Sequence, residues 1–539
     1  MLRQVQPRLE TIAKAPNILY PGKYSREDSD VGFYEALELT KLRDNAINRL
    51  LPDSPVPIKR SSVSWLNSEQ TAYSQIADQF DFIFKDGSFD IGNANYRLDA
   101  QEYLRANESA QESLQLVFNN LAHMAKIKAE DRHEGLPGFL KRAGFFCELV
   151  NGYKPFNNAP GALSKVNDYV ASVKEAPAFR KLEEMVRKTK DGFDLHMVWR
   201  IAPGLEGKEV VSAHLQPIKT DMREFSDDFE LFHFNRSSSY GGESKPIEGI
   251  VHRAVSLKYR RHMANAEAQM NETMELLPQT AVYLAYLGYA NWLERSRGLK
   301  FVRPIFTQPD AERAVIQGAW HPLVAETKPT VVGNPVVYDS KNPITVLTGP
   351  NKGGKSVYLK SVGWTHALGL KGFFVPAISA ELVPRDGIYT HFVTSEDITK
   401  GESRFSDEMN RMGKIFKKAT PRSLVLLDEP CSGTTLSAGE IKTRQFLNMF
   451  GKLGCSTFLT THMEGIPNGV VSGEIGRAVN KHLGFTNNGG SLTYSYKLED
   501  GPAKMDYGVQ LADSWGLGEG DLEALLHERA KKEGFDLSR

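Results

Sequence analysis

Residues Gly349-Pro-Asn-Lys-Gly-Gly-Lys355-Ser356 decide the fold of this chain. They match the pattern Gly-x-x-x-x-Gly-Lys-Ser/Thr, in which glycines let backbone N–H groups converge on the phosphates of a nucleotide. The apolar segment 344–348 before them predicts a buried strand. Residues 357–370 after them predict a helix, whose N-terminus favours negative charge. A strand, a glycine-rich turn and a helix in this order predict a phosphate-binding loop.

We expect this loop to bind the triphosphate of ATP together with Mg²⁺. Lys355 would reach the β- and γ-phosphates, and the Ser356 hydroxyl would ligate the metal. The expected nucleotide-binding residues are Gly349, Pro350, Asn351, Lys352, Gly353, Gly354, Lys355, Ser356, Val357 and, further along the chain, Ser403.

Two carboxylates end a second predicted strand, because Asp428 and Glu429 follow the aliphatic run 424–427. In open α/β sheets ligands bind at the carboxyl ends of the strands. Asp428 would hold Mg²⁺, directly or through water, and Glu429 would polarise the water that attacks the γ-phosphate. An apolar strand ending in Asp-Glu is common by itself. Its place 73 positions after Lys355 (428 minus 355) indicates an ATPase.

Two further polar residues fit the same site. His462 ends a third predicted strand, 456–461, and could hydrogen-bond the γ-phosphate. Ser403 stands at the start of a predicted helix, from which a serine can contact a nucleotide held by a second subunit. Considered alone, Ser403 is only a good helix N-cap. The expected catalytic residues are Glu429, His462 and Lys355, and the expected metal ligands are Ser356 and Asp428.

Composition limits the class of protein. A chain of 539 residues is too long for one core and predicts roughly two to four domains. Its 66 basic and 66 acidic residues cancel, which excludes a surface coated in positive charge but allows a local basic patch. The three cysteines suit neither a disulfide framework nor a metal site, so a cytoplasmic location is expected. No apolar run is long enough to span a membrane, and residues 280–293 predict a buried helix.

The two halves of the chain differ in pattern. Apolar residues at three- and four-residue spacing predict helices over 39–51, 100–128, 161–189 and 253–296. Short extended pieces are expected at 81–85 and 195–199. After Pro304 short strands alternate with helices, which predicts a parallel sheet covered on both faces.

Together these motifs resemble the ATPase domain of the MutS DNA mismatch-repair family. Thr348-Gly-Pro-Asn-Lys-Gly-Gly-Lys-Ser-Val-Tyr-Leu is close to the family's Thr-Gly-Pro-Asn-Met-Gly-Gly-Lys-Ser-Thr-Tyr. Other segments carry the likeness in the family's order: 277–303, Trp320-His321-Pro322-Leu323, Ser403-Arg404-Phe405 with Glu408-Met409, Asp428-Glu429 with Gly433-Thr434-Thr435, and Asp506-Tyr507-Gly508-Val509. The likeness covers about residues 275–525 and is weak before them.

The resemblance implies an α/β P-loop, ABC-like ATPase domain at the C-terminus, preceded by a mostly α-helical core and lever region. The expected division is a mixed N-terminal region, 1–115, a helical core and lever, 116–304, and the ATPase domain, 305–539. It also implies DNA as a partner, no membrane partner, and a homodimer in which Ser403 of one subunit completes the ATP site of the other. A cytoplasmic protein, nucleoid-associated if bacterial, is expected.

Several positions depart from the family's pattern. Lys352 stands where the family has methionine, and Pro430-Cys431-Ser432 follows Asp-Glu in place of Ile/Leu-Gly-Arg. Val331 stands where the family has an aromatic that stacks on adenine. Phe33-Tyr34-Glu35 matches the family's mismatch wedge, but the amphipathic run after it favours a helix. The sequence therefore resembles a reduced member without an evident mismatch-recognition domain or clamp.

DNA contact can be placed only indirectly. Two basic clusters on predicted helices are candidates for phosphate contacts: Arg253, Lys258, Arg260 and Arg261, and Arg411, Lys414, Lys417 and Lys418. Such clusters are more often solvated helix faces. An ABC-type ATPase and a nucleotide-gated protein scaffold that binds no DNA remain alternatives, although no Leu-Ser-Gly-Gly-Gln segment precedes Asp428.

Overall fold

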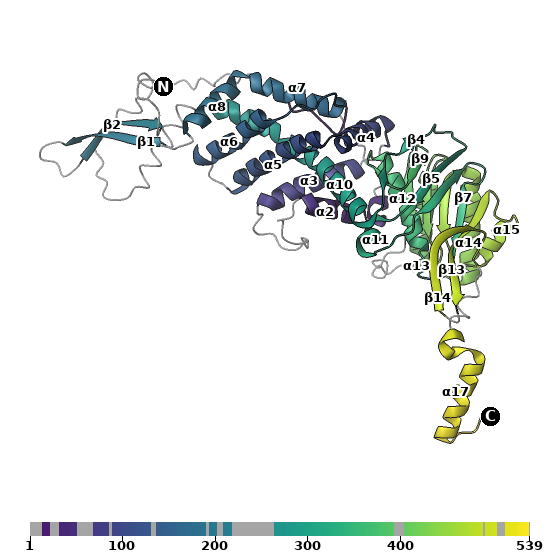
Figure 1. Cartoon of the computed structure of the whole chain (residues 1–539). Helices are drawn as coiled ribbons and strands as arrows, with labels where there is room; N and C mark the ends of the chain where they lie inside the picture. Colours follow the sequence, from purple (N-terminus) through teal and green to yellow (C-terminus); the bar gives the residue numbers. More distant parts are fainter. Residues whose placement is uncertain are drawn as a thin grey trace. The chain divides into compact units, whose positions relative to one another are not determined.

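The computed structural model of the chain contains two compact units (Figure 1). The residues that it describes are 13–21, 32–50, 68–85, 89–130, 136–189, 193–201, 208–217, 263–392, 404–488, 491–503 and 513–537. The first unit comprises Met1–Lys23, Leu50–Gln79 and Tyr103–Ala285. The second comprises Tyr24–Arg49, Phe80–Glu102 and Tyr286–Arg539. The division into regions 1–115, 116–304 and 305–539 stays a prediction.

The first unit is mostly helical, as its apolar spacing predicted. Its main elements are α5 (Glu108–Glu130), α6 (Leu136–Gly152), α7 (Gly161–Glu175), α8 (Pro177–Thr189) and the antiparallel strands β1 (Phe193–Ile201) and β2 (Lys208–Pro217). Leu114, Val117 and Leu121 of α5 recur every three or four residues and are fully buried. The buried Arg142 of α6 forms a two-pronged ion pair with Glu267. Strand β1 confirms the extended piece expected at 195–199.

The helices predicted over 100–128 and 161–189 are each broken, so those predictions were wrong in extent. The helix predicted over 253–296 is interrupted by a turn at Glu275, and residues 253–262 lie outside the described ranges. Between α4 (Ile91–Ala106) and α5, the carbonyl of Asn107 accepts the N–H groups of Ala110 and Gln111. Asparagine favours helix starts because it satisfies backbone groups locally. Pro177 separates α7 from α8, because the residue before a proline is driven out of the helical region and Ala176 is extended.

The second unit begins with α1 (Gly32–Ala36) and α2 (Leu39–Leu50) and includes the end of α3 (Ser68–Phe84) and part of α10 (Leu276–Arg297). The extended piece expected at 81–85 was wrong, because residues 81–84 are helical. Phe80 and Phe84 lie one turn apart and stack, and both also stack on Phe373. A short run rich in apolar residues suits a buried helix as well as a strand.

A six-stranded sheet in the order β10-β11-β12-β7-β13-β14 organises the second unit. Its strands are β10 (Ile388–His391), β11 (Leu424–Asp428), β12 (Ser456–Thr460), β7 (Ile344–Thr348), β13 (Ala478–Asn488) and β14 (Ser491–Asp500). All are parallel except β14, which is antiparallel to β13. The three strands predicted from the sequence are confirmed as β7, β11 and β12. Because they are parallel, their carboxyl ends share one edge.

Smaller sheets complete the unit. They contain β3 (Phe301–Val302) with β8 (Val375–Pro376), and β4 (Ile305–Phe306), β9 (Ser379–Leu382), β5 (Arg313–Ala319) and β6 (Asn334–Asp339). The unit also contains α11 (Pro322–Thr327), the short η3 (Asp513–Leu517) and α17 (Glu519–Glu533). None of the helices in the described ranges has both the length and the apolar composition that a membrane crossing requires.

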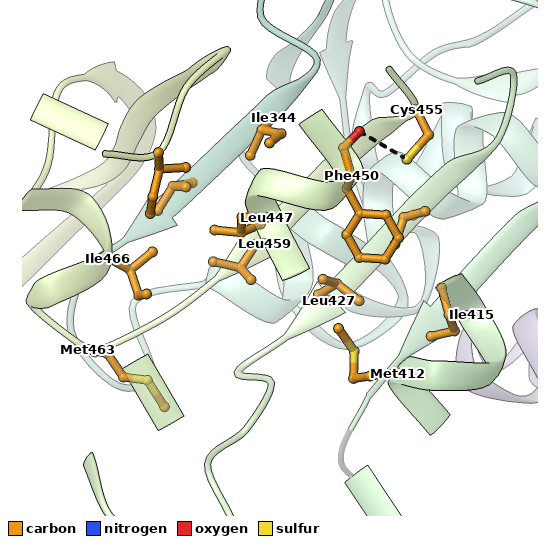
Figure 2. Packing of buried hydrophobic residues seen from close by; sticks show 13 residues of the cluster. Ile344, Met412, Ile415, Leu427, Leu447, Phe450, Cys455, Leu459, Met463 and Ile466 are labelled. Carbon is orange, nitrogen blue, oxygen red and sulfur yellow. Dashed lines mark hydrogen bonds between the residues drawn. The ribbon is translucent and has the colours of Figure 1, made fainter. Parts of the chain in front are cut away.

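Helices cover both faces of the large sheet. Val425 and Leu427 face a core built with α13 (Arg404–Lys418), α14 (Leu436–Leu453) and α15 (Gly465–Val471) (Figure 2). Leu426 points the other way, toward Gly363 of α12 (Lys355–Leu370), where a Cβ would lie 2.8 Å from its Cδ1. Because side chains alternate along a strand, the aliphatic run of β11 contributes to the hydrophobic cores on both faces of the sheet.

Helix α12 is buried on nearly all sides by elements of its own unit. The Trp364 indole N–H donates to the carbonyl of Leu37 (2.6 Å), and the Lys360 ammonium pairs with Glu38 (2.7 Å). At its C-terminal end, Arg97 of α4 donates to the carbonyl of Lys371 (2.7 Å). The turn between α1 and α2 and the helix α4 thus hold the helix that follows the glycine-rich loop.

Glu38 provides a pH-dependent test of this packing. Burial raises its pKa, but hydrogen bonds from Lys360 and Lys41 outweigh burial and lower the pKa to about 2. A carboxylate with a depressed folded pKa stabilises the fold above its unfolded pKa and loses that effect as the pH falls through the folded value. Glu38→Gln should therefore cost about 1 kcal/mol at pH 7. The penalty should shrink between pH 4.5 and about 2.

Chemical denaturation at several pH values measures this difference. Glu35→Gln is the matched control, because Glu35 is an exposed carboxylate of the neighbouring α1. It should change the unfolding free energy by less than about 0.5 kcal/mol at every pH. A Glu38→Gln penalty that stays constant across the whole acidic range would contradict the assigned ion pair.

Candidate functional site

The glycine-rich loop has a backbone shape that few residues tolerate. Gly349 has φ 142° and Gly354 has φ 93°, both in a region that favours glycine. A Cβ on Gly353 would lie 2.8 Å from the carbonyl oxygen of Pro350. Lys352 is exposed and also has a positive φ, 64°. The loop therefore curls tightly at the start of α12, as an anion cradle made of backbone amides requires.

Lys355 is the buried cation of this loop. Its side chain is 5% exposed, and its ammonium donates to the carbonyls of Gly349 (2.9 Å) and Pro350 (3.2 Å). Burial lowers its pKa, while the nearby carboxylates of Glu429 and Asp428 oppose that shift. The ammonium is thus bound by two carbonyl groups of its own loop. The phosphate oxygens of a nucleotide bound in this loop would compete with these carbonyls for the ammonium.

Asp428 joins the ends of two strands to the first turn of α12. The Ser356 hydroxyl donates to Asp428 Oδ1 (3.0 Å), and so does the Thr460 hydroxyl (2.6 Å). Asp428 and Thr460 are partners in the β11–β12 register. A hydroxyl and a carboxylate side by side form the kind of oxygen donor set that Mg²⁺ uses when phosphates and water fill its other positions. The residues present therefore fit a magnesium ion.

Glu429 occupies a strained position directly after β11. Its φ is 48°, a left-handed conformation that costs a non-glycine residue about 1 kcal/mol or more. Its N–H donates to both oxygens of Thr460, each at 3.1 Å. The carboxylate lies between two basic side chains: Oε1 is 3.7 Å from the Lys355 ammonium, and Oε2 is 3.4 Å from His462 Nδ1. The turn thus aims the carboxylate into the site.

The structure brings most of the predicted site residues together. Lys355, Ser356, Asp428, Glu429 and His462 form one connected cluster. Ser403 and the basic cluster 253–261 lie outside the described residues. On α13, Lys414, Lys417 and Lys418 are exposed and Arg411 is partly exposed.

The structure also places Val357 and the residues that match the mismatch wedge. Val357 is 38% exposed and belongs to the first turn of α12. Phe33 and Tyr34 are buried in α1, and the Tyr34 hydroxyl donates to Asp81 (2.6 Å). Side chains packed in this way serve the helical core, so the Phe33-Tyr34-Glu35 match is part of a helix and not an exposed wedge.

Sequence reasoning missed Tyr496. Its ring lies against the loop, because a Cβ on Gly354 would be 3.1 Å from Tyr496 Cδ1. The residue is 41% exposed and has φ 54°, and its carbonyl accepts a hydrogen bond from the Asn334 side chain (2.9 Å). Aromatic residues are ordinary in strands. Nothing in the local sequence therefore distinguishes a tyrosine 141 positions after Lys355 (496 minus 355).

The arrangement places the second unit among α/β proteins that bind ligands at the carboxyl edge of a parallel sheet. The sequence profile described as MutS domain V matches residues 345–525. This is the ATPase domain of the MutS family. Over residues 345–525 the chain is therefore similar to that family, which confirms the resemblance drawn from the motifs.

Proteins named DNA mismatch repair protein MutS are similar to part of this chain. That of Streptococcus thermophilus (strain ATCC BAA-491 / LMD-9) is 31% identical over 220 residues, 40% of this chain and 25% of the relative. That of Haloquadratum walsbyi is 34% identical over 223 residues, 40% of this chain and 23% of the relative. That of Natronomonas pharaonis is 31% identical over 276 residues, 50% and 31%. The chain thus spans about a quarter to a third of the length of these relatives.

Proposed function

We propose that this chain is an ATP-dependent DNA-binding protein of the MutS type, in which ATP hydrolysis switches the grip on DNA. One observation carries the ATPase part. The cation Lys355, the oxygen pair of Ser356 and Asp428, and the carboxylate of Glu429 converge at one edge of a parallel sheet, inside a MutS domain V. These are the groups that nucleotide hydrolysis requires in P-loop proteins.

Each side chain has a definite task in this proposal. Lys355 would exchange the carbonyls of Gly349 and Pro350 for the β- and γ-phosphates. Ser356 and Asp428 would hold Mg²⁺, which would supply positive charge to neutralise the phosphates. Glu429 would orient the attacking water and accept its proton, because its carboxylate already points into the site.

His462 would link the γ-phosphate to Glu429. Its ring lies 3.4 Å from the Glu429 carboxylate and is 45% exposed, so it can contact a ligand and the catalytic base together. Ligand-dependent contacts at such a position distinguish the ATP state from the ADP state. We propose that the protein uses this difference between the ATP and ADP states as its signal, and not the products of hydrolysis.

A homodimer through the ATPase domain belongs to the same proposal. Only Ala530 is buried among the residues of α17, while Leu522, Leu525 and Leu526 are each about half exposed. Trp515 and Leu517 just before this helix are also exposed. Apolar side chains gathered on one terminal segment favour a protein partner, and a second copy of the chain would supply the same surface.

The first experiment separates binding from hydrolysis at the assigned residues. Lys355→Ala should weaken Mg-ATP affinity by about 100-fold or more, because it removes the cation nearest the phosphates. Glu429→Gln should leave affinity within about 3-fold but lower kcat by at least about 100-fold. Calorimetric titration with Mg-ATP and steady-state phosphate release measure the two quantities.

The wild-type protein and an exposed-residue variant, Lys341→Ala, are the controls. Lys341 lies in the turn after β6, and its side chain takes no part in the site. Wild-type protein that binds no Mg-ATP, or a Lys355→Ala variant with unchanged affinity, would refute the ATPase assignment.

Tyr496 is proposed as the platform for the adenine base. Its exposed ring beside Gly354 can stack on a base, and stacking on an aromatic residue is worth about 1–3 kcal/mol. Tyr496→Ala should therefore weaken ATP affinity by about 5- to 100-fold, while Tyr496→Phe should retain it. Inorganic triphosphate is the control ligand, because it has no base. Equal losses for ATP and triphosphate would contradict stacking.

DNA binding is tested by gel-shift titration with homoduplex, mismatched and branched DNA, with and without ATP. We expect binding that weakens steeply with salt, since phosphate contacts dominate such interfaces, and that changes with the nucleotide present. The preferred DNA structure, mismatched or branched, is the part of the proposal that this titration decides. Indifference to every DNA would instead favour the nucleotide-gated scaffold.

A further inference from the structure

The segment after the catalytic carboxylate, residues 430–435, has a conformation that must be imposed from outside. We call it the post-Glu429 loop. Its second residue, Cys431, is fully buried and has φ 61°. Together with Glu429, φ 48°, it makes two left-handed non-glycine residues within three positions. Such strain persists only where surrounding contacts hold it.

One of those contacts comes from a buried carboxylate of α13. The N–H of Gly433 donates to Glu408 Oε2 at 3.1 Å, and Glu408 is 5% exposed. Two further contacts come from α14. The Thr443 hydroxyl donates to the carbonyl of Pro430 at 3.4 Å, and Gly439 leaves room for the carbonyl of Cys431, which would lie 2.7 Å from a Cβ there.

The element that carries Glu408 is itself firmly placed. Met412 and Ile415, one and two turns further along α13, are buried in the core beside Leu427 of β11 (Figure 2). The strand that ends in Asp428 and the helix that carries Glu408 therefore share one core. Glu408 can act as a fixed point against which the post-Glu429 loop is held.

We infer that Glu408 is a positioning residue for hydrolysis. Its carboxylate holds the post-Glu429 loop through Gly433, and the loop keeps Glu429 in the left-handed conformation that aims its carboxylate between Lys355 and His462. This inference rests on the proposed function and adds to it a residue outside the cluster of Lys355, Ser356, Asp428, Glu429 and His462. If this buried carboxylate had only a packing role, its removal would not lower the rate of hydrolysis while leaving nucleotide affinity unchanged.

The first measurement needs no nucleotide. In Glu408→Ala, hydrogen exchange of peptides covering 430–435 should become at least about 10-fold faster than in the wild type, because the acceptor of the Gly433 N–H is lost. In Glu408→Gln the side-chain oxygen can still accept that N–H, so exchange should stay within about 3-fold. Unchanged exchange in Glu408→Ala would overturn the assigned contact.

The second measurement separates kcat from affinity. Glu408→Ala should lower kcat at least about 10-fold while the Kd for Mg-ATP changes less than about 3-fold, and Glu408→Gln should restore most of the rate. If Glu408→Ala does not fold, Glu408→Met, which keeps the length without an oxygen, takes its place. Equal changes in kcat and Kd, or a kcat within about 2-fold of wild type, would overturn the inference.

Asp386→Ala is the matched control. The Asp386 carboxylate also holds a loop, since it accepts the Ser423 hydroxyl at 2.9 Å, but at the opposite end of β11. It should lower stability without changing kcat by more than about 2-fold. Wild-type protein that hydrolyses no ATP would overturn the proposed function and this inference together. Active wild type with an equally active Glu408→Ala would overturn this inference alone.

Discussion

The parallel pairing of β7, β12 and β11 is the constraint on which the rest of this site depends. In this register Asp428 lies beside Thr460, and Thr460 lies beside Leu347, the residue before Thr348. Three chain segments that are far apart in sequence therefore end at one edge. The hydroxyl of Thr460 and the N–H of Glu429 tie two of these ends together directly. A one-residue slip would turn each of these strand-end side chains to the other face of the sheet.

Helix α12 connects that edge of the sheet to other elements of its unit. It begins at Lys355 in the loop and ends where α4 binds the carbonyls of Lys371 and Gly372. Between these ends the turn between α1 and α2 accepts the Trp364 indole and the Lys360 ammonium. Helix α12 therefore connects the glycine-rich loop to α4 and to the turn between α1 and α2.

The residues of the site were largely predictable from the sequence, because they lie in short motifs. The β7 strand, the glycine-rich loop, the Asp428-Glu429 pair and His462 were each expected from local sequence, and the structure gathers them. Local sequence patterns were less reliable where the same apolar pattern suits more than one secondary structure. Residues 81–84 are helical although they suit a strand, and Asn107 and Pro177 interrupt helices that apolar spacing alone made continuous.

By itself the sequence determined the glycine-rich loop, the strand that ends in Asp428 and the resemblance to the MutS family. Each of those motifs depends on side-chain type and local spacing, and the resemblance depends on the order of the motifs along the chain. Only the tertiary structure decided that Tyr496 lies on Gly354, that Glu408 holds Gly433, and that Phe33 and Tyr34 are buried. These contacts join segments that no local pattern relates. They form because folding brings distant segments together, so that apolar side chains are buried against each other and buried polar groups find hydrogen-bond partners.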